Sequence, residues 1–386
     1  MNAILQFLSD PLPFLVWTTL AKSAGLLGVV LVMVSYTVYA ERRVSSLMQD
    51  RLGPNRTGFP TSLLGFGIKD WSPFLGGLGQ PIADALKLLL KEDFTPAYVN
   101  KFYYWIAPGL GIGAAIISLA VIPFGSSIAG VDMVIANVDI GPLFVFAISS
   151  LGVYGIVLAG WSSNSKYPFL GAVRSTNQLI SYELALGLSI VPLILIIGKL
   201  NLVEIVSYQV QNGWMLLPGI TAKAPHLPTL EQFLTWIPVF IAFLVFTISM
   251  FAETNRLPFD LPEAETELVS GYHTEYSSLK FALFFLGEYT AMITGSALIV
   301  TLFLGGWHFP GIPDGSAAGW LGVMWGLVNI GVFLAKVVAF LIFFIFIRWT
   351  LPRFRYDQLM KLGWIWFFEI ALVNIFITAL IVTYVH

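Results

Sequence analysis

Long apolar stretches, separated by shorter polar segments, run the length of the chain. A helix needs about 20 mostly apolar residues to cross about 30 Å of hydrocarbon, because each residue adds about 1.5 Å. Eight stretches meet this requirement, near residues 14–40, 102–124, 141–161, 179–198, 234–252, 281–304, 320–347 and 364–385. The alternating pattern of barrel strands, about ten residues long, is absent. The pattern predicts an all-α polytopic membrane protein with about eight transmembrane helices in a single membrane domain, residues 1–386.

Two of the connecting segments carry amphipathic patterns. Within the long segment 41–101, apolar residues at 82, 85, 86, 89 and 90 form a helical stripe beside a charged face. We expect this segment to lie in the membrane interface rather than to cross the membrane. The segment 199–233 predicts a second short amphipathic helix, with Leu202, Ile205 and Val206 on its apolar face, followed by a loop punctuated by Pro and Gly.

Basic residues are concentrated in alternate loops. Of the 20 Lys and Arg residues, sixteen lie in the four loops that follow the first, third, fifth and seventh spans, and two lie in the segments on the opposite side. Lys and Arg are retained on the cytoplasmic side of a membrane. These four loops are therefore predicted to face the cytoplasm, with both termini on the outer, periplasmic side.

The composition excludes several classes of function. Charged residues make up 11% of the chain, against roughly 25% in soluble domains. A formal net charge of -2 gives no electrostatic footprint for nucleic acid. The absence of cysteine excludes disulfides, thiolate zinc sites and iron–sulfur clusters within the chain, and the four histidines are scattered without metal-ligand spacing. No metal site is therefore predicted, and any redox centre must come from a bound cofactor or a partner.

The most informative polar segment is the acidic loop after the fifth span, residues 253–280. Its acids are Glu253, Asp260, Glu263, Glu265, Glu267 and Glu275, with one Arg, Arg256, among them. Such a run of charges is often a solvated turn, and spacing alone leaves that interpretation open. Interleaved apolar residues, including Phe259, Leu261 and Tyr272, give the segment side chains to bury. They favour an acidic segment that packs against the protein.

Ionisable residues also occur inside the spans. They are Lys22, Glu183, Glu288, Lys336 and Glu369. An ionisable group at mid-membrane costs about 2.5–3.5 kcal/mol on insertion scales, so it usually faces a polar interior and marks a function. Lys22 and Glu369 lie near span ends, where snorkelling to the interface is the favoured interpretation and a functional role is the alternative. Glu183 and Glu288 fit a line of buried carboxylates that carries protons, and Lys336 is a candidate intramembrane charge.

Short motifs in every basic loop resemble those of one family. They are Glu41-Arg42-Arg43, Arg51-Leu52-Gly53-Pro54-Asn55-Arg56, Gln80-Pro81-Ile82-Ala83-Asp84, Gly160-Trp161-Ser162-Ser163-Asn164-Ser165-Lys166-Tyr167, Ser181-Tyr182-Glu183, the 252–276 segment, and Pro352-Arg353-Phe354-Arg355-Tyr356-Asp357-Gln358-Leu359-Met360. This set resembles the H-subunit family of bacterial respiratory complex I, a family of membrane subunits whose mitochondrial counterpart is subunit 1. The resemblance extends from about residue 14 to 384. Eight spans with outward termini match the topology of that family.

The resemblance implies a quinone channel and a proton path. Channel or chamber positions are implied for Glu41, Arg42, Asp84, Ala85 and Phe259. An acidic path leading from the quinone chamber into the membrane is implied for Glu253, Asp260, Glu263, Glu265, Glu267, Glu183 and Glu288. The chain would be a subunit of a proton-translocating NADH:quinone oxidoreductase, with no catalytic residue of its own in the narrow sense.

The resemblance also implies the surroundings of the chain. Quinone, either ubiquinone or menaquinone, would be the substrate, whereas NADH, flavin and iron–sulfur clusters would belong to partner subunits. The expected partners are the other complex I membrane subunits, the peripheral subunits of the quinone site and the lipid bilayer. The expected location is the inner (plasma) membrane.

Some features depart from the family pattern, and two rival functions remain. The chain carries extra residues within 57–79 and a long segment 199–233, and Ser150 stands where some members carry a glutamate. One rival is the homologous membrane subunit of a hydrogenase- or antiporter-like complex without quinone. The other is a free-standing secondary transporter, which the absence of evident internal repeats disfavours. The complete Gly-Pro-Asn-Arg motif at 53–56 and the Glu-x-Glu-x-Glu motif at 263–267 favour the quinone enzyme.

Overall fold

The protein folds into a bundle of long helices. A computed structural model describes residues 11–55, 57, 77–128, 130–222, 230–261, 271–315 and 319–385. In these residues, eight helical segments are long and apolar enough to cross a membrane. They are formed by α2 (Pro11–Met48), α4 (Lys101–Ser118), α5 (Gly141–Ser162), α6 (Lys166–Ile197), α8 (Leu230–Glu253), α9 (Ser278–Phe303), α10 (Trp320–Thr350) and the continuous α11–η3–α12 unit. The predicted all-α polytopic class is confirmed.

Several helices extend beyond their apolar spans. The helix α6 begins at Lys166, well before the apolar stretch that starts near residue 179. Its polar first half is not solvated on all sides, because Ser175 and Gln178 are buried. The last unit joins α11 (Tyr356–Lys361), the π-helical η3 (Leu362–Phe367) and α12 (Phe368–Val385). Hydropathy detects only the apolar part of such helices, whereas backbone hydrogen bonding continues past the interface.

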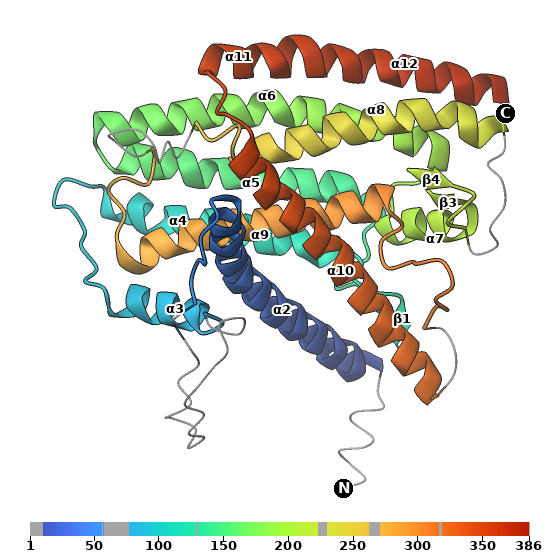
Figure 1. The fold of residues 1–386 in the computed structure, drawn as a ribbon, viewed down its shortest axis with the longest axis horizontal. Coiled ribbons are helices and arrows are strands. Elements are labelled where there is room, and N and C mark those ends of the chain that lie inside the picture. Colours follow the sequence, from blue (N-terminus) through green and yellow to red (C-terminus); the bar gives the residue numbers. More distant parts are fainter. Residues whose placement is uncertain are drawn as a thin grey trace, which may run out of the picture.

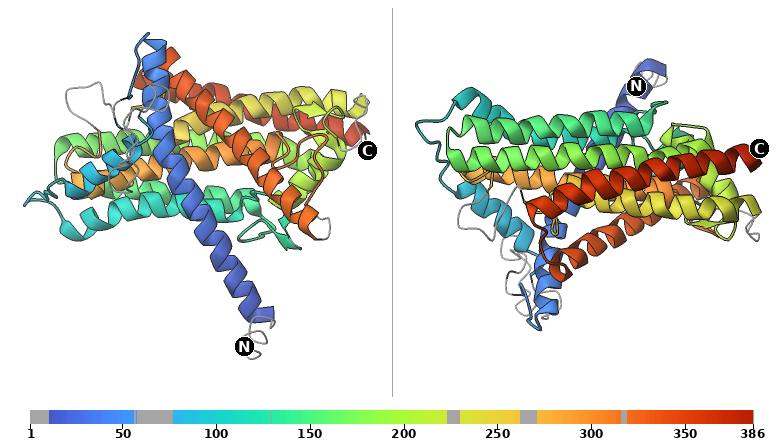
Figure 2. Two further views of the ribbon diagram at one scale, coloured as in Figure 1. Left: turned by 60° about the horizontal axis from the view of Figure 1, so that its bottom comes forward. Right: turned by 90° about the horizontal axis from the view of Figure 1, so that it is seen from above.

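The helix α9 is the centre of the bundle. In its most apolar stretch 72% of the residues are buried, against at most 44% in the same stretch of the other spans. It contacts α2, α4, α8 and α10, and the connections after α2, α5, α8 and α10 all lie in the left half of Figure 1. Two helices, α2 and α10, cross the others obliquely, and the N-terminal half of α2 stands away from the bundle (Figure 2). This obliquity leaves space beside α9.

Shorter elements complete the fold. The amphipathic patterns correspond to α3 (Gln80–Leu90) and α7 (Leu202–Asn212), and the side chain of Asn201 caps α7 by accepting from the backbone N–H of Val203 at 2.9 Å. A single 3₁₀ turn, η2 (Leu119–Val121), ends the α4 span. Two antiparallel hairpins, which were not predicted, pair β1 (Ser127–Ile128) with β2 (Val131–Asp132) and β3 (Gly213–Trp214) with β4 (Leu217–Pro218).

Lys336 in α10 binds the C-terminal end of α9. Its ammonium donates hydrogen bonds to the carbonyl oxygens of Leu304 at 2.7 Å, Gly306 at 3.0 Å and His308 at 2.7 Å. It also lies 4.1 Å from the ring centroid of Trp214. The end of a helix carries partial negative charge and unsatisfied carbonyls, which a cation stabilises. This capping role accounts for the intramembrane charge.

Candidate functional site

A cavity of about 1000 Å³, which we name the large cavity, lies between α2, α3, α9 and α10. Glu41 and Arg42 of α2 line it, together with Asp84 and Ala85 of α3. Four of the five residues predicted for the channel therefore come together, although they lie on helices about 40 residues apart in sequence. Most of the remaining lining is apolar.

The wall that α3 contributes to the large cavity is held by polar contacts. No side chain of α3 is buried. Arg42 and Asp84 form an ion pair at 2.8 Å, which ties α3 to α2. At the other end of α3, the hydroxyl of Ser278 donates to the carbonyl oxygens of Leu88 and Lys91, each at 3.0 Å. The position of this wall is therefore set by hydrogen bonds to α2 and α9.

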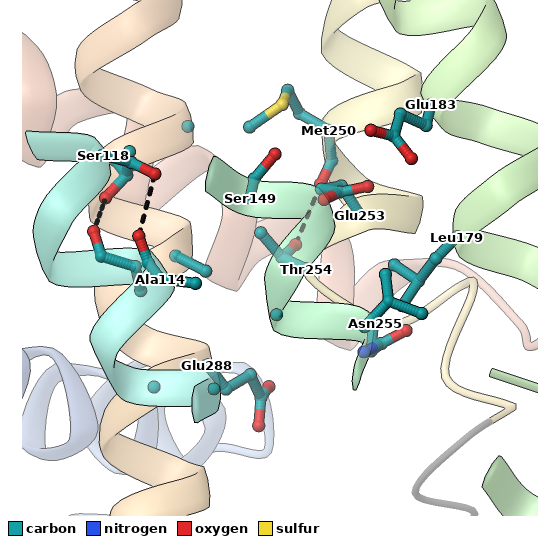
Figure 3. A pocket seen from close by; sticks show the side chains of 18 of the residues that line it. Ala114, Ser118, Ser149, Leu179, Glu183, Met250, Glu253, Thr254, Asn255 and Glu288 are labelled. Atoms are coloured by element: carbon teal, nitrogen blue, oxygen red, sulfur yellow. Dashed lines mark hydrogen bonds between the residues drawn. The ribbon is translucent and has the colours of Figure 1, made fainter. Parts of the chain in front are cut away.

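A second cavity of about 120 Å³, the small cavity, lies among α4, α5, α6, α8 and α9. Glu183, Glu253 and Glu288 line it, which brings together three of the acids predicted for the proton path. Figure 3 shows Glu183 and Glu253 approaching each other from α6 and α8, with Glu288 farther along α9. The walls are mostly apolar, and a cavity of this size has room for several water molecules where its carboxylates offer hydrogen-bond partners.

Arg256 joins the two cavities. Its guanidinium lies 2.5 Å from a carboxylate oxygen of Glu288 in the small cavity and 3.4 Å from a carboxylate oxygen of Glu41 in the large cavity. It also stacks over the ring of Tyr289, 4.2 Å from the centroid, and the hydroxyl of Tyr289 donates to Glu41 at 2.5 Å. Arg348 forms a further ion pair with Glu41. This buried network compensates two carboxylates that would otherwise be costly to bury.

The sequence analysis did not select Arg256, Tyr289 or Arg348 as site residues. A signal for Arg256 was available, because it is the one Arg among the six acids of residues 253–275. Buried carboxylates require a nearby cation. No comparable signal marks Tyr289 or Arg348, because their partner Glu41 lies 248 and 307 residues away in sequence.

The remaining predicted residues belong to the loop after α8, and the two that the structure describes, Phe259 and Asp260, line neither cavity. Phe259 is buried, with its ring centroid 5.4 Å from that of Tyr182 and 5.5 Å from that of Phe354, and it does not line the large cavity. Asp260 pairs with Arg353 at 2.9 Å. The other predicted acids of the loop lie outside the described residues: Glu263, Glu265 and Glu267.

His273 lies between the two cavities. Its ring contacts Phe281 and Phe285, which line the large cavity, and the neighbouring Tyr272 lines the small cavity. Burial among these aromatic rings lowers the pKa of His273 from its ordinary value of 6.5 to about 4. The imidazole is therefore neutral at physiological pH. Over the described part of the chain, no group of three or more His, Asp or Glu side chains is placed to hold a metal ion.

These features define a class of protein: a polytopic helical membrane protein with a buried network of charges between two cavities. The sequence model of the NADH dehydrogenase family matches residues 21–379. The chain belongs to this family. The resemblance to the H-subunit family of complex I is thereby confirmed, and so is the assignment to a membrane.

Curated relatives match over nearly their whole length. The NADH-quinone oxidoreductase H-subunit 1 of Geobacter metallireducens is 45% identical over 363 residues, which cover 93% of this chain and 94% of the relative. The H-subunit 2 of Koribacter versatilis is 43% identical, covering 94% and 96%. NADH-quinone oxidoreductase subunit 8 of Rhodothermus marinus is 43% identical, covering 95% and 97%. These relatives are subunits of an enzyme complex.

We expect His273 to make stability depend on pH. Between about pH 6.5 and pH 4 the unfolded chain binds a proton at His273 and the folded chain does not, so stability falls as the pH falls through this window. His273→Phe keeps an aromatic ring and removes the titration. The temperature of thermal inactivation of the solubilised protein, measured from pH 7.5 down to 4.5, should therefore fall less steeply in the variant. Equal pH slopes for both proteins would contradict a buried neutral imidazole.

Proposed function

We propose that this chain forms the quinone channel and the coupling path of a proton-translocating NADH-quinone oxidoreductase. The observation that carries the proposal is the buried Arg256, which contacts Glu41 at the large cavity and Glu288 at the small cavity. The names of the relatives support the same enzyme. Charge developing in one cavity is thereby connected to carboxylates in the other.

The large cavity has the properties that a quinone requires. Small-molecule sites have volumes of about 300–1,000 Å³ and mostly apolar walls with a few polar groups. A quinone combines a long apolar tail with a polar headgroup, and the large cavity combines an apolar lining with Glu41, Arg42 and Asp84. Ala85 leaves space beside these polar groups. Phe259, packed on Tyr182 and Phe354, holds the loop that carries Arg256.

Quinone reduction changes charge near this network. Forming the quinol takes two electrons and two protons, and negative charge on the headgroup raises the proton affinity of nearby carboxylates. Glu41, Arg256 and Glu288 pass this change to Glu253 and Glu183 in the small cavity. Asp260, Glu263, Glu265 and Glu267 extend the acidic path on the quinone side. Coupling then follows from linkage between proton occupancy and the packing of this region.

The remaining parts of the enzyme lie outside this chain. Flavin and iron–sulfur clusters on partner subunits would supply the electrons that NADH donates for quinone reduction. The excess of basic residues in four loops, sixteen of 20 in the whole chain, supports a cytoplasmic position for those loops and an outer position for both termini. The peripheral subunits of the quinone site dock on that cytoplasmic side, and other membrane subunits of complex I contact the spans within the inner membrane.

Ala85→Trp tests the channel. An indole at this position fills part of the large cavity, and overfilling a site costs about 1–3 kcal/mol, so kcat/KM for a long-tailed quinone should fall about tenfold. NADH oxidation with a water-soluble artificial acceptor should be unchanged. The control is Leu86→Trp, one residue along α3, where the exposed side chain does not line the cavity. Equal quinone kinetics for the two variants would exclude the large cavity as the channel.

Glu253→Gln tests the proton path. Glutamine keeps the shape of the side chain but carries no exchangeable acid proton, and a positioned proton carrier contributes about 100-fold or more to the steps that it serves. Proton translocation by the assembled enzyme in liposomes should fall about tenfold or more. Glu204→Gln is the control, because Glu204 is exposed and pairs with Lys199 at the surface. Normal translocation in Glu253→Gln would remove this residue from the path.

A further inference from the structure

Glu369 lies on the outer face of α12. This helix lies at the edge of the bundle and packs against α6 and α8 (Figure 1). Ala371, Asn374 and Thr378 form its inner, buried face, in line with the buried Phe367 at the end of η3. The opposite face exposes Glu369 among large apolar side chains that follow it at helical spacing: Val373, Phe376, Ile377 and Leu380. An acid thus interrupts a face that is otherwise suited to hydrocarbon.

The depth of Glu369 is fixed by the charged and aromatic residues before it. Lys361 is the last charged residue of α11, and Glu369 follows it eight residues later, about 12 Å along the helix axis. Trp364 and Trp366 lie between them, as expected for side chains at the membrane interface. The carboxylate therefore lies about one to two helical turns below the interface, inside the hydrocarbon region.

Within the described part of the chain, nothing compensates this carboxylate. No hydrogen bond or ion pair of Glu369 occurs within the described ranges. Side chains on a helix lean toward its N-terminus, which here points to Lys361, but a glutamate side chain is too short to span about 12 Å. An acid in hydrocarbon is costly and usually faces protein. Moreover, the π-helical η3 immediately before α12 shifts the face on which Glu369 lies, and such turns frequently occur at functional sites.

We propose that the outer face of α12 is the docking surface for a transmembrane helix of another subunit, and that this helix presents a Lys or Arg to Glu369. The proposal rests on membership of a multi-subunit complex and extends it to a particular surface. The acid requires a cation, and the apolar residues around it provide the packing surface that helix association in a membrane needs. Lipid alone supplies no such compensating charge in its hydrocarbon region.

The variant Glu369→Leu distinguishes between two possible neighbours of Glu369, a partner helix and lipid. If Glu369 faces lipid, Leu removes a costly acid, and the amount of assembled complex in the membrane stays the same or rises. If Glu369 pairs with a partner's cation, Leu leaves that cation buried without a counter-charge, and the assembled complex falls at least about tenfold. Glu369→Lys should reduce assembly further by direct repulsion. Unchanged or increased assembly of Glu369→Leu would overturn the proposal.

A cross-linking experiment does not depend on the stability of the Glu369 variants. The chain contains no cysteine, so an introduced cysteine is the only thiol of this subunit that can carry a photoactivatable label, and cross-links that the labelled unsubstituted enzyme also gives are discounted. Val373→Cys on the outer face should cross-link to one other subunit. Ala371→Cys, two residues away on the buried face, is the matched control and should give only cross-links within the chain. Cross-links from Val373→Cys to lipid alone would also overturn the proposal.

The docking proposal and the proposed function can be overturned independently of each other. Glu369 lines neither cavity, so complex that still assembles with Glu369→Leu should show normal quinone turnover per complex. Exchanging the charges, with Glu369→Lys combined with Lys or Arg→Glu in the cross-linked helix, should restore assembly. If Glu369→Leu assembles normally but loses quinone turnover, Glu369 acts in turnover and not in docking, and the docking proposal is overturned. That result would not test the assignment of the large cavity as the quinone channel.

Discussion

The buried guanidinium of Arg256 is the interaction on which the rest of the site depends. Two carboxylates, Glu41 and Glu288, come from helices that cross each other inside an apolar bundle, and each would be costly to bury alone. Arg256 contacts both, and Arg348 adds a second positive charge beside Glu41. Removing one partner of a buried ion pair costs about 3–5 kcal/mol, because the other charge stays uncompensated. The network thus fixes α2, the loop after α8, α9 and α10 relative to one another.

The central helix α9 separates the two cavities. Glu288 lines the small cavity, and the next residue, Tyr289, lines the large one. Consecutive helical residues point about 100° apart, so one turn of a single rigid helix serves both sides. Because α9 is the most buried span, and Lys336 holds its far end, this partition is among the most constrained parts of the fold. Arg256 and one turn of α9 are therefore the shortest connection between charges in the large cavity and those in the small cavity.

Sequence reasoning recovered the elements better than their pairings. Hydropathy and helical periodicity predicted eight spans, the stripe of α3 and the short α7, because each signal is local. The grouping of Glu41, Arg42, Asp84 and Ala85 came from motif resemblance, since no local rule brings residues 41 and 84 together. Arg256 had a signal, as the one Arg among six acids, but its partner Glu41 could not be predicted, because an ion pair over 215 residues leaves no periodic trace. Lys336 had the signature of a functional charge, yet a helix end supplies its partners.

The central claim is that one guanidinium couples the two cavities, and Arg256→Lys tests it most directly. Lysine keeps the positive charge, but a single ammonium lacks the planar fork that reaches Glu41 and Glu288 together. The measurement is the number of protons translocated per NADH oxidised by the assembled variant in liposomes. We predict a lower ratio than in the wild type while the complex still assembles. An unchanged ratio at normal assembly would contradict coupling through Arg256.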